Sequence, residues 1–196
     1  MEDRKSSVYF VTGNSHKFEE VQQLFDKELK MITLKQLDLN PLEIQADTLQ
    51  EVAKYKLESL KNRISEGSYF IEDAGFFIDS PLNGFPGVYS SYIFKTIGNE
   101  GILNLIKPFE ESKAHFASVV ALFFEPLDKA YFFEGIVNGT VSSEIKGSQG
   151  FGFDPIFVPN EIPDKTFAQI TRDQKNKISH RGKALKQLIE FIKKRT

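Results

Sequence analysis

Residues 71–91 read Ile71-Glu-Asp-Ala-Gly-Phe-Phe-Ile-Asp-Ser-Pro-Leu-Asn-Gly-Phe-Pro-Gly-Val-Tyr-Ser-Ser91. The apolar run over residues 69–71 predicts a buried strand that ends at two adjacent carboxylates, Glu72 and Asp73, and Gly75 frees the backbone directly after them. Paired carboxylates at a strand end can hold a hard cation such as Mg²⁺, or one of them can take a proton from water. A solvated strand terminus is the alternative for such a pair taken alone.

The composition excludes several classes of protein. The chain has 196 residues, which favours a single domain over residues 1–196, and no cysteine, which excludes disulfides and zinc–thiolate sites. Its 25 Lys and Arg against 27 Asp and Glu give a net charge of −2, without the basic surface expected of a nucleic-acid-binding protein. No uncharged apolar run approaches the length of a membrane span. We therefore expect a cytoplasmic protein with neither nucleic-acid nor membrane partners.

A strand, a turn and a helix follow one another near the N-terminus. Residues 8–12 are an apolar run that predicts a strand, and a helical pattern of apolar residues begins at Phe18. The turn between them reads Gly13-Asn-Ser-His-Lys17. A helix N-terminus favours an anion, and a lysine is unfavourable there unless an anion offsets it. The position of Lys17 therefore suggests phosphate, although such junctions are common in α/β proteins.

A second helix is predicted after residue 48. Thr48 and Glu51 have the spacing of a capping box, and an apolar stripe follows them at helical spacing. Lys54 and Lys56 lie off this stripe. The pattern alone therefore places both lysines on a solvated face.

Short apolar runs predict further strands over residues 31–37, 114–125, 130–137 and 140–145. The second and third of these runs are separated by four residues that include a proline, which predicts a β-hairpin. Residues 83–87 predict a turn, and residues 101–106 predict a short helix.

A second dense stretch reads Gly147-Ser-Gln-Gly-Phe-Gly-Phe-Asp-Pro-Ile-Phe157. Its glycines hold Phe151 and Phe153 on backbone that can approach a ligand closely, and Asp154 adds an acceptor beside the rings. A nucleobase could stack on such a ring, which is worth roughly 1–3 kcal/mol per base. The alternative is that a ring packs into the hydrophobic core at the end of a hairpin, and we expect that role for one of the two rings.

The C-terminal segment predicts a helix that begins after Ser179, a natural N-cap, with an apolar stripe over residues 184–192. His180 and Arg181 then occupy the first turn of this helix. Isolated pairs of this kind are usually surface residues. Two helix starts that carry cationic or donor groups in one chain favour a shared polyanion.

Four blocks of the sequence resemble the inosine triphosphate pyrophosphatase (Ham1-like) family of nucleotide hydrolases. They are Thr12-Gly-Asn-Ser-His-Lys17, Glu72-Asp-Ala-Gly75 with Asn83-Gly-Phe-Pro-Gly87, Gly150-Phe-Gly-Phe-Asp-Pro155 and Ser179-His-Arg-Gly-Lys-Ala-Leu185. The blocks follow the order of the family over nearly the whole chain. The resemblance implies an α/β protein with an elongated, two-lobed fold around a long mixed β-sheet flanked by helices, and a homodimer. It also implies Mg²⁺-dependent hydrolysis of deaminated purine nucleoside triphosphates (ITP, dITP, XTP) to the monophosphate and pyrophosphate, which cleanses the nucleotide pool.

The resemblance assigns roles to residues position by position. It implies substrate-binding roles for Thr12, Gly13, Asn14, Lys17, Lys56, Phe151, Gly152, Phe153, Asp154, Lys175, His180 and Arg181. The lysines face the phosphates, Phe151 stacks on the base, and Asp154, His180 and Arg181 read the base. It implies metal-binding roles for Glu43, Glu72 and Asp73, and catalytic roles for Asp73, Glu72 and Lys17. Which of the two adjacent carboxylates is the ligand and which is the base stays open.

The implied base-reading group agrees with a preference for deaminated bases. Donors from His180 and Arg181 suit a 6-oxo group, whereas a 6-amino group would meet donors with donors. Two residues depart from the family pattern: Ala74 stands where many relatives have Ser or Thr, and Phe153 replaces a common Tyr or Trp. Two other functions stay open, namely a nucleotide-binding module without turnover and a single-stranded RNA binder that stacks bases on Phe151 and Phe153. The net charge of −2 disfavours the RNA binder.

Overall fold

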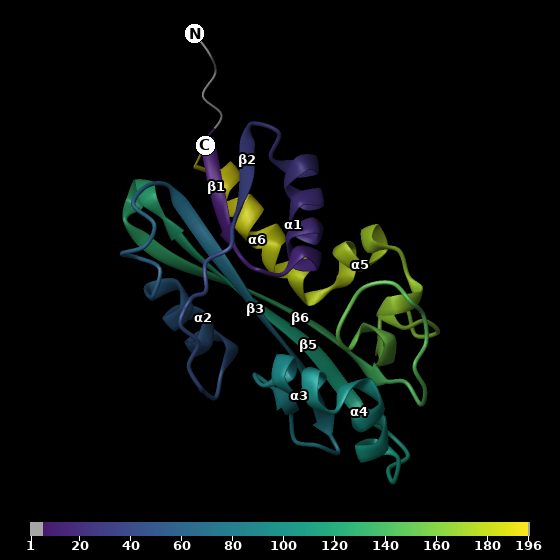
Figure 1. Ribbon diagram of the computed structural model, residues 1–196. Helices are drawn as coiled ribbons and strands as arrows, with labels where there is room; N and C mark the ends of the chain where they lie inside the picture. The colour runs from purple at the N-terminus through teal and green to yellow at the C-terminus, as the bar shows by residue number, and fades with distance from the viewer. Residues whose placement is uncertain (1–5, 196) are drawn as a thin grey trace. The chain divides into compact units, whose positions relative to one another are not determined.

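The structure is a computed structural model, and it describes residues 6–195. Its strands are β1 (Ser6–Val11), β2 (Ile32–Leu37), β3 (Ser68–Ser80), β4 (Phe85–Gly87), β5 (Lys113–Phe124), β6 (Lys129–Val141) and β7 (Phe157–Pro159). Its helices are α1 (Ser15–Glu28), α2 (Leu49–Glu58), α3 (Ser90–Thr96), α4 (Gly98–Ile106), α5 (Arg172–Ile178) and α6 (His180–Lys193) (Figure 1). Within the described residues, none of these helices combines the length and the apolar character that a membrane crossing requires.

The strands of residues 6–195 form one seven-stranded sheet in the order β2-β1-β3-β5-β6-β7, with β4 paired to β3. Strand β1 runs parallel to β2 and to β3, whereas β4 is antiparallel to β3 and β7 is antiparallel to β6. The sheet is therefore mixed, which confirms the predicted fold class. The short connection of residues 125–128 between β5 and β6, which are neighbours in the sheet, also confirms the predicted hairpin.

The chain divides into two compact units. The first unit extends to Asp73 and also includes Val119–Glu134 and the segment from Ala184. The second unit comprises Ala74–Ser118 and Gly135–Lys183. Strands β3, β5 and β6 contribute residues to both units. The single domain expected over residues 1–196 stays a prediction.

The core of the first unit forms where helices α1 and α6 cover one face of its strands (Figure 1). Val21 and Phe25 on α1 pack with Leu188 of α6 against buried strand residues. The rings of Phe10 and Phe70 stack in this layer with centroids 4.7 Å apart and an angle of 6° between their planes. Burial of one such side chain contributes about 1.5–3 kcal/mol, so this apolar layer fixes both helices on the strands.

The core of the second unit is rich in aromatic side chains. The ring of Phe116 lies 4.8 Å from that of Phe76 and 4.9 Å from that of Phe157. Phe153 joins this core, since it is only 4% exposed and its ring lies 5.1 Å from Phe76. Phe151 is half-buried and does not belong to this core. The expectation that one of the two rings of the glycine-rich stretch is a core residue is therefore confirmed, and Phe153 is that ring.

Strand β3 does not end at the two carboxylates, so the prediction of a strand terminus there is wrong. The strand continues to Ser80, and Glu72 and Asp73 lie in its middle. Gly75 serves a different purpose from the predicted one, because a Cβ atom at this position would lie 2.6 Å from the carbonyl oxygen of Gly87. The glycine allows the close approach of β4 to β3 rather than a change in chain direction.

Two further boundaries differ from the predictions. The turn predicted over residues 83–87 ends at Gly84, because Phe85–Gly87 form β4. The strand predicted over residues 140–145 is also wrong, since β6 itself extends to Val141 and residues 142–150 form neither helix nor strand. Pairing with β7, in which Val141 lies opposite Phe157, carries β6 beyond the end of its continuous apolar run.

Candidate active site

The turn between β1 and α1 leads into a capped helix start, a cap that was not predicted from the sequence. Asn14 is the N-cap of α1, and its side-chain oxygen accepts a hydrogen bond of 3.1 Å from the backbone N–H of Lys17. The hydroxyl of Thr12 accepts a hydrogen bond of 3.1 Å from the N–H of Asn14. A Cβ atom at Gly13 would lie 2.9 Å from a carboxylate oxygen of Asp38, so a side chain at this position would displace the Asp38 carboxylate. These contacts fix Lys17 in the first turn of α1.

Lys17 pairs with the first of the two carboxylates of β3. Its ammonium lies 2.7 Å from the Oε2 atom of Glu72 and also donates a hydrogen bond of 3.3 Å to the backbone carbonyl of that residue. The Glu72 side chain is 0% exposed and that of Lys17 is 17% exposed. Removal of one partner from such a buried ion pair leaves a costly uncompensated charge. The pair therefore anchors α1 to β3 and fixes the Lys17 ammonium.

Lys56 of α2 pairs with the second carboxylate. Its ammonium lies 3.2 Å from the Oδ1 atom of Asp73 and 3.3 Å from the Oε2 atom of Glu43. The Lys56 side chain is only 12% exposed, so the solvated face expected for it from the helical pattern is wrong. Lys54 does lie on that face, with its side chain 63% exposed. Lys56 thus brings together two carboxylates that are 30 positions apart in the sequence, residues 43 and 73.

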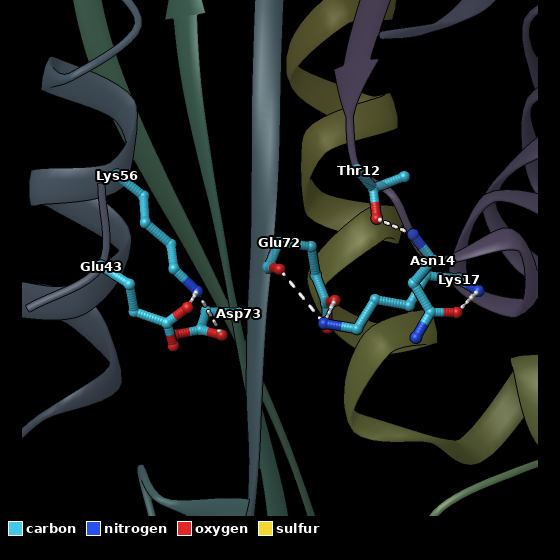
Figure 2. Close-up of polar contacts among 7 residues, drawn as sticks. All are labelled: Thr12, Asn14, Lys17, Glu43, Lys56, Glu72 and Asp73. Carbon is cyan, nitrogen blue, oxygen red and sulfur yellow. Dashed lines mark hydrogen bonds and ion pairs between the residues drawn. The ribbon is translucent and has the colours of Figure 1, made fainter. Parts of the chain in front are cut away.

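The two ion-pair clusters lie on opposite sides of β3 (Figure 2). Successive side chains of a strand point to opposite faces, so the adjacent carboxylates of Glu72 and Asp73 diverge. The structure thus brings together Glu43 and Asp73 but not Glu72, of the three carboxylates implied as metal ligands. Among residues 6–195, no three His, Cys, Asp or Glu side chains converge so that they could hold a metal ion.

Glu43 and Asp73 fit a magnesium ion better than a cation that needs a full protein cage. Both carboxylates already converge on one positive charge, the Lys56 ammonium. Mg²⁺ in nucleotide-processing proteins is usually held by one or two carboxylates together with substrate phosphates and water. A pair of carboxylates is therefore a sufficient protein contribution to such a site.

Burial raises the pKa of Asp73 above its usual value, and the negative charge of Glu72 adds to this rise. The ammonium groups of Lys56 and Lys17 act in the opposite direction. A carboxylate with a raised pKa is a better proton acceptor than an ordinary aspartate, and such shifts are common at catalytic sites. The environment of Asp73 therefore suits a general base.

The second unit carries a cluster of aromatic and cationic side chains around Phe151. The Asp154 carboxylate accepts a hydrogen bond of 2.8 Å from the N–H of Phe151 and one of 2.6 Å from the Lys175 ammonium. The Lys175 ammonium lies 5.0 Å from the centroid of the Phe151 ring, and the Arg181 guanidinium lies 5.3 Å from it. Lys175 therefore lies beside the predicted stacking ring, a contact that its sequence position alone does not reveal.

His180 and Arg181 begin α6 as predicted, with Ser179 in extended backbone before them. The hydroxyl of Ser179 accepts a hydrogen bond of 3.1 Å from the N–H of Gly182, which confirms its role as N-cap. The His180 ring stacks on Phe116 with centroids 4.7 Å apart and an angle of 10°. Both His180 and Arg181 are only 2% exposed, so their side chains are buried within the second unit.

Sequence reasoning missed two residues of this second cluster. Phe116 supports the His180 ring, but an apolar residue in a strand reads simply as core. Asn99 of α4 donates a hydrogen bond of 3.1 Å to the carbonyl of Gly152, 53 positions away in the sequence. The Gly98-Asn99 pair has the composition of a turn, but no local signal identifies so distant a partner.

Comparison with known proteins agrees with these features. The Ham1 family matches residues 8–191 of this chain. A dITP/XTP pyrophosphatase of Thermococcus kodakarensis is 46% identical over 184 residues, which cover 94% of this chain and 96% of that protein. A dITP/XTP pyrophosphatase of Pyrococcus horikoshii is 45% identical over 186 residues, which cover 95% and 96% respectively.

Solved structures of Ham1 proteins also resemble this chain. The Ham1 protein of Staphylococcus aureus matches with a TM-score of 0.82 and 26% identity, covering 97% of this chain and 100% of that one. A HAM1 protein of Coxiella burnetii matches with a TM-score of 0.82 and 27% identity, covering 96% and 99%. These matches confirm the resemblance found in the sequence. The chain belongs to the Ham1 family.

Proposed function

We propose that this chain hydrolyses deaminated purine nucleoside triphosphates (ITP, dITP and XTP) to the monophosphate and pyrophosphate. The observation that carries the proposal is that the Lys56 ammonium holds the carboxylates of Asp73 and Glu43 together. Burial raises the pKa of this same Asp73 carboxylate. The relatives that are 46% and 45% identical are named dITP/XTP pyrophosphatases, which supports the same reaction and substrate class.

The first unit supplies the groups for phosphoryl transfer. Asp73 accepts a proton from the attacking water at its carboxylate, while Lys56 holds this carboxylate in place by their ion pair of 3.2 Å. Lys17 and the capped turn at Asn14 offer positive charge and N–H groups to the phosphates. Glu43 and Asp73 would hold Mg²⁺, which when bound offsets the negative charge of the phosphates.

Glu72 serves this reaction indirectly. Its carboxylate is fully buried and paired with Lys17, so a proton taken up there would break the ion pair. Protonation of Asp73 costs less, because Lys56 then retains Glu43 as its partner. We therefore assign the general base to Asp73, and to Glu72 the positioning of Lys17.

The second unit supplies the groups that recognise a base. Phe151 offers a half-buried ring for stacking, and the cations of Lys175 and Arg181 lie beside it. The nitrogen donors of His180 and Arg181 suit the 6-oxo group of a deaminated purine. Adenine presents an amino group at this position and leaves such donors unsatisfied, which is a strong basis for discrimination.

Three further parts of the proposal rest on membership of the family. They are a requirement for Mg²⁺, a homodimer and a cytoplasmic location. Chelation with EDTA should abolish turnover, and added Mg²⁺ should restore it. Light scattering should give twice the chain mass of 22.3 kDa.

The test compares ITP, XTP, dITP and ATP side by side, with pyrophosphate and the monophosphates measured as products. Pyrophosphate release from the three deaminated substrates, with ATP at least about a hundredfold slower in kcat/KM, would support the proposal. Asp73→Asn should lower kcat by about 10²–10⁴-fold. Tight binding of ITP without any product would favour a nucleotide-binding module, and no binding at all would refute both functions.

A further inference from the structure

The loop that carries Phe151 depends on two glycines in left-handed backbone conformation. Gly150 and Gly152 flank the ring, and both adopt positive φ, at +73° and +63°. A Cβ atom at Gly150 would lie 2.1 Å from a carboxylate oxygen of Asp154, whereas one at Gly152 would meet nothing within 4 Å. Asp154 therefore lies close against the N-terminal side of Phe151, to whose N–H it is hydrogen-bonded, whereas the space beside Gly152 on the other side is open.

Asn99 contacts the loop on the side where Gly152 lies. Its side-chain N–H group donates a hydrogen bond of 3.1 Å to the carbonyl of Gly152. Asn99 reaches this carbonyl because Gly98, with φ of +62°, lets α4 begin directly after α3. A second contact joins the same segments, since the ring of Phe94 on α3 packs edge-on against Phe153 at 5.4 Å.

The side-chain amide of Asn99 costs stability at this position. Its Oδ1 atom is buried and has no hydrogen-bond partner among the described residues. A buried polar atom left unsatisfied costs stability, and an apolar side chain of similar shape would avoid that cost. What the amide adds at this position is the hydrogen bond to the Gly152 carbonyl, next to the predicted stacking ring.

We infer that Asn99 is a positioning residue for Phe151, so that α4 sets the orientation of the ring on which the base stacks. This inference rests on the proposed function for its substrate. Asn99 lowers the entropy that the loop loses when a base stacks, and it acts on affinity for the base and not on the chemical step. Preorganisation of this kind raises affinity without a new contact to the ligand.

The test uses Asn99→Leu, which keeps the shape and removes both the donor and the unsatisfied oxygen. Asn104→Leu is the matched control, because Asn104 lies exposed on the same helix. We expect Asn99→Leu to raise KM for ITP about five- to tenfold, the size of one neutral hydrogen bond, with kcat changed less than twofold. The midpoint of thermal unfolding should stay close to that of the wild type, because the loss of the bond to the Gly152 carbonyl and the removal of the unsatisfied oxygen act in opposite directions. The control should change none of these quantities.

A fluorescent reporter separates the position of the ring from turnover. The chain has no tryptophan, so Phe151→Trp places a single indole at the ring position. In this background, Asn99→Leu should lower the anisotropy of Trp emission in nucleotide-free protein and weaken binding of inosine monophosphate five- to tenfold. Binding of inorganic pyrophosphate, which has no base, should stay within twofold.

The outcomes distinguish the inference from the proposed function. If the wild type does not turn over ITP, the proposed function fails, yet the anisotropy of the nucleotide-free protein still decides whether Asn99 holds the ring. Unchanged anisotropy and unchanged KM in Asn99→Leu would overturn the inference. Equal losses of affinity for inosine monophosphate and pyrophosphate, together with a lower unfolding temperature, would also overturn it, because they indicate a purely structural role.

Discussion

The carboxylates of Glu72 and Asp73 are adjacent in β3 but pair with lysines of two different helices, Lys17 on α1 at 2.7 Å and Lys56 on α2 at 3.2 Å (Figure 2). Successive side chains of a strand point to opposite faces, so the two carboxylates lie on opposite sides of β3 and have different partners. We therefore expect them to have different roles. One carboxylate is fully buried and anchors a cation, and the other keeps some exposure and shares its lysine with Glu43. The predictions below test this division of roles.

Lys17→Met should destabilise the protein strongly, because it removes the ammonium that compensates the buried Glu72 charge. Loss of one partner of a buried pair typically costs about 3–5 kcal/mol. Urea unfolding at pH 7 measures the loss. Lys54→Met is the control, since Lys54 forms an exposed pair of 4.0 Å with Glu58, and exposed helical pairs contribute only about 0.3–0.5 kcal/mol. The double variant Lys17→Met/Glu72→Gln should recover much of the stability; equal losses in the single and double variants would contradict the buried pair.

Asp73→Asn should stabilise the metal-free protein at neutral pH while it removes activity. The pKa of Asp73 is higher in the folded state, so its favourable contribution is complete below the unfolded pKa and is lost as the pH rises through the folded pKa. At pH 7 the ionised, buried carboxylate therefore disfavours folding, and the neutral amide relieves this. Urea unfolding in EDTA should show the gain at pH 7 and its disappearance near the ordinary value of 3.8. A variant less stable than the wild type at pH 7 would argue against a raised pKa.

Lys56→Met should shift the acid limb of the pH–activity profile to higher pH. The Lys56 charge and its hydrogen bond both lower the pKa of Asp73, so their removal lets burial raise that pKa further. Asp73 must be ionised to accept a proton, and the variant then requires a higher pH for activity. The measurement is kcat/KM for ITP against pH at saturating Mg²⁺, with Lys54→Met as the exposed lysine control. A limb that stays in place while the rate falls would assign Lys56 to phosphate binding alone.

Local signals predicted the elements that begin the candidate site. The N-cap at Ser179 and the capping box of Thr48 depend on residues within four positions of one another, and the structure confirms both. Helix α1 begins at Ser15, within the segment predicted as a turn, because the Asn14 side chain caps it there. The continuation of β3 through Gly75 could not be predicted in the same way, because that glycine is required by the distant carbonyl of Gly87. The error had a direct consequence, since a strand that continues places Glu72 and Asp73 on opposite faces.

Long-range contacts also explain the residues that sequence reasoning missed or misplaced. Lys56 lies off the apolar stripe of α2, yet its side chain is only 12% exposed and pairs with Asp73 and Glu43. Asn99 reaches Gly152 across 53 positions. Contacts of this kind depend on which segments the sheet brings together, and neither periodicity nor a capping motif carries that information.

Phe151→Ala and Phe153→Ala should separate binding from stability within one three-residue segment. Phe153 is 4% exposed and packs on Phe76, so its truncation should cost about 3–5 kcal/mol of unfolding free energy. Phe151 is half-buried beside Lys175 and Arg181, and its truncation should cost far less stability. Loss of a stacked base is worth about 1–3 kcal/mol, which corresponds to a rise in KM for ITP of roughly 5- to 150-fold.

Urea unfolding and ITP kinetics on both variants measure the two effects, and Phe151→Leu serves as the control for apolar area without a π face. Leu at this position should preserve stability and still raise KM, because the aromatic face that stacks on the base is lost while the side-chain volume is largely kept. If Phe151→Leu binds ITP as tightly as the wild type, the ring does not stack on the base. Base selectivity would then have to come from the polar groups of Asp154, His180 and Arg181 alone.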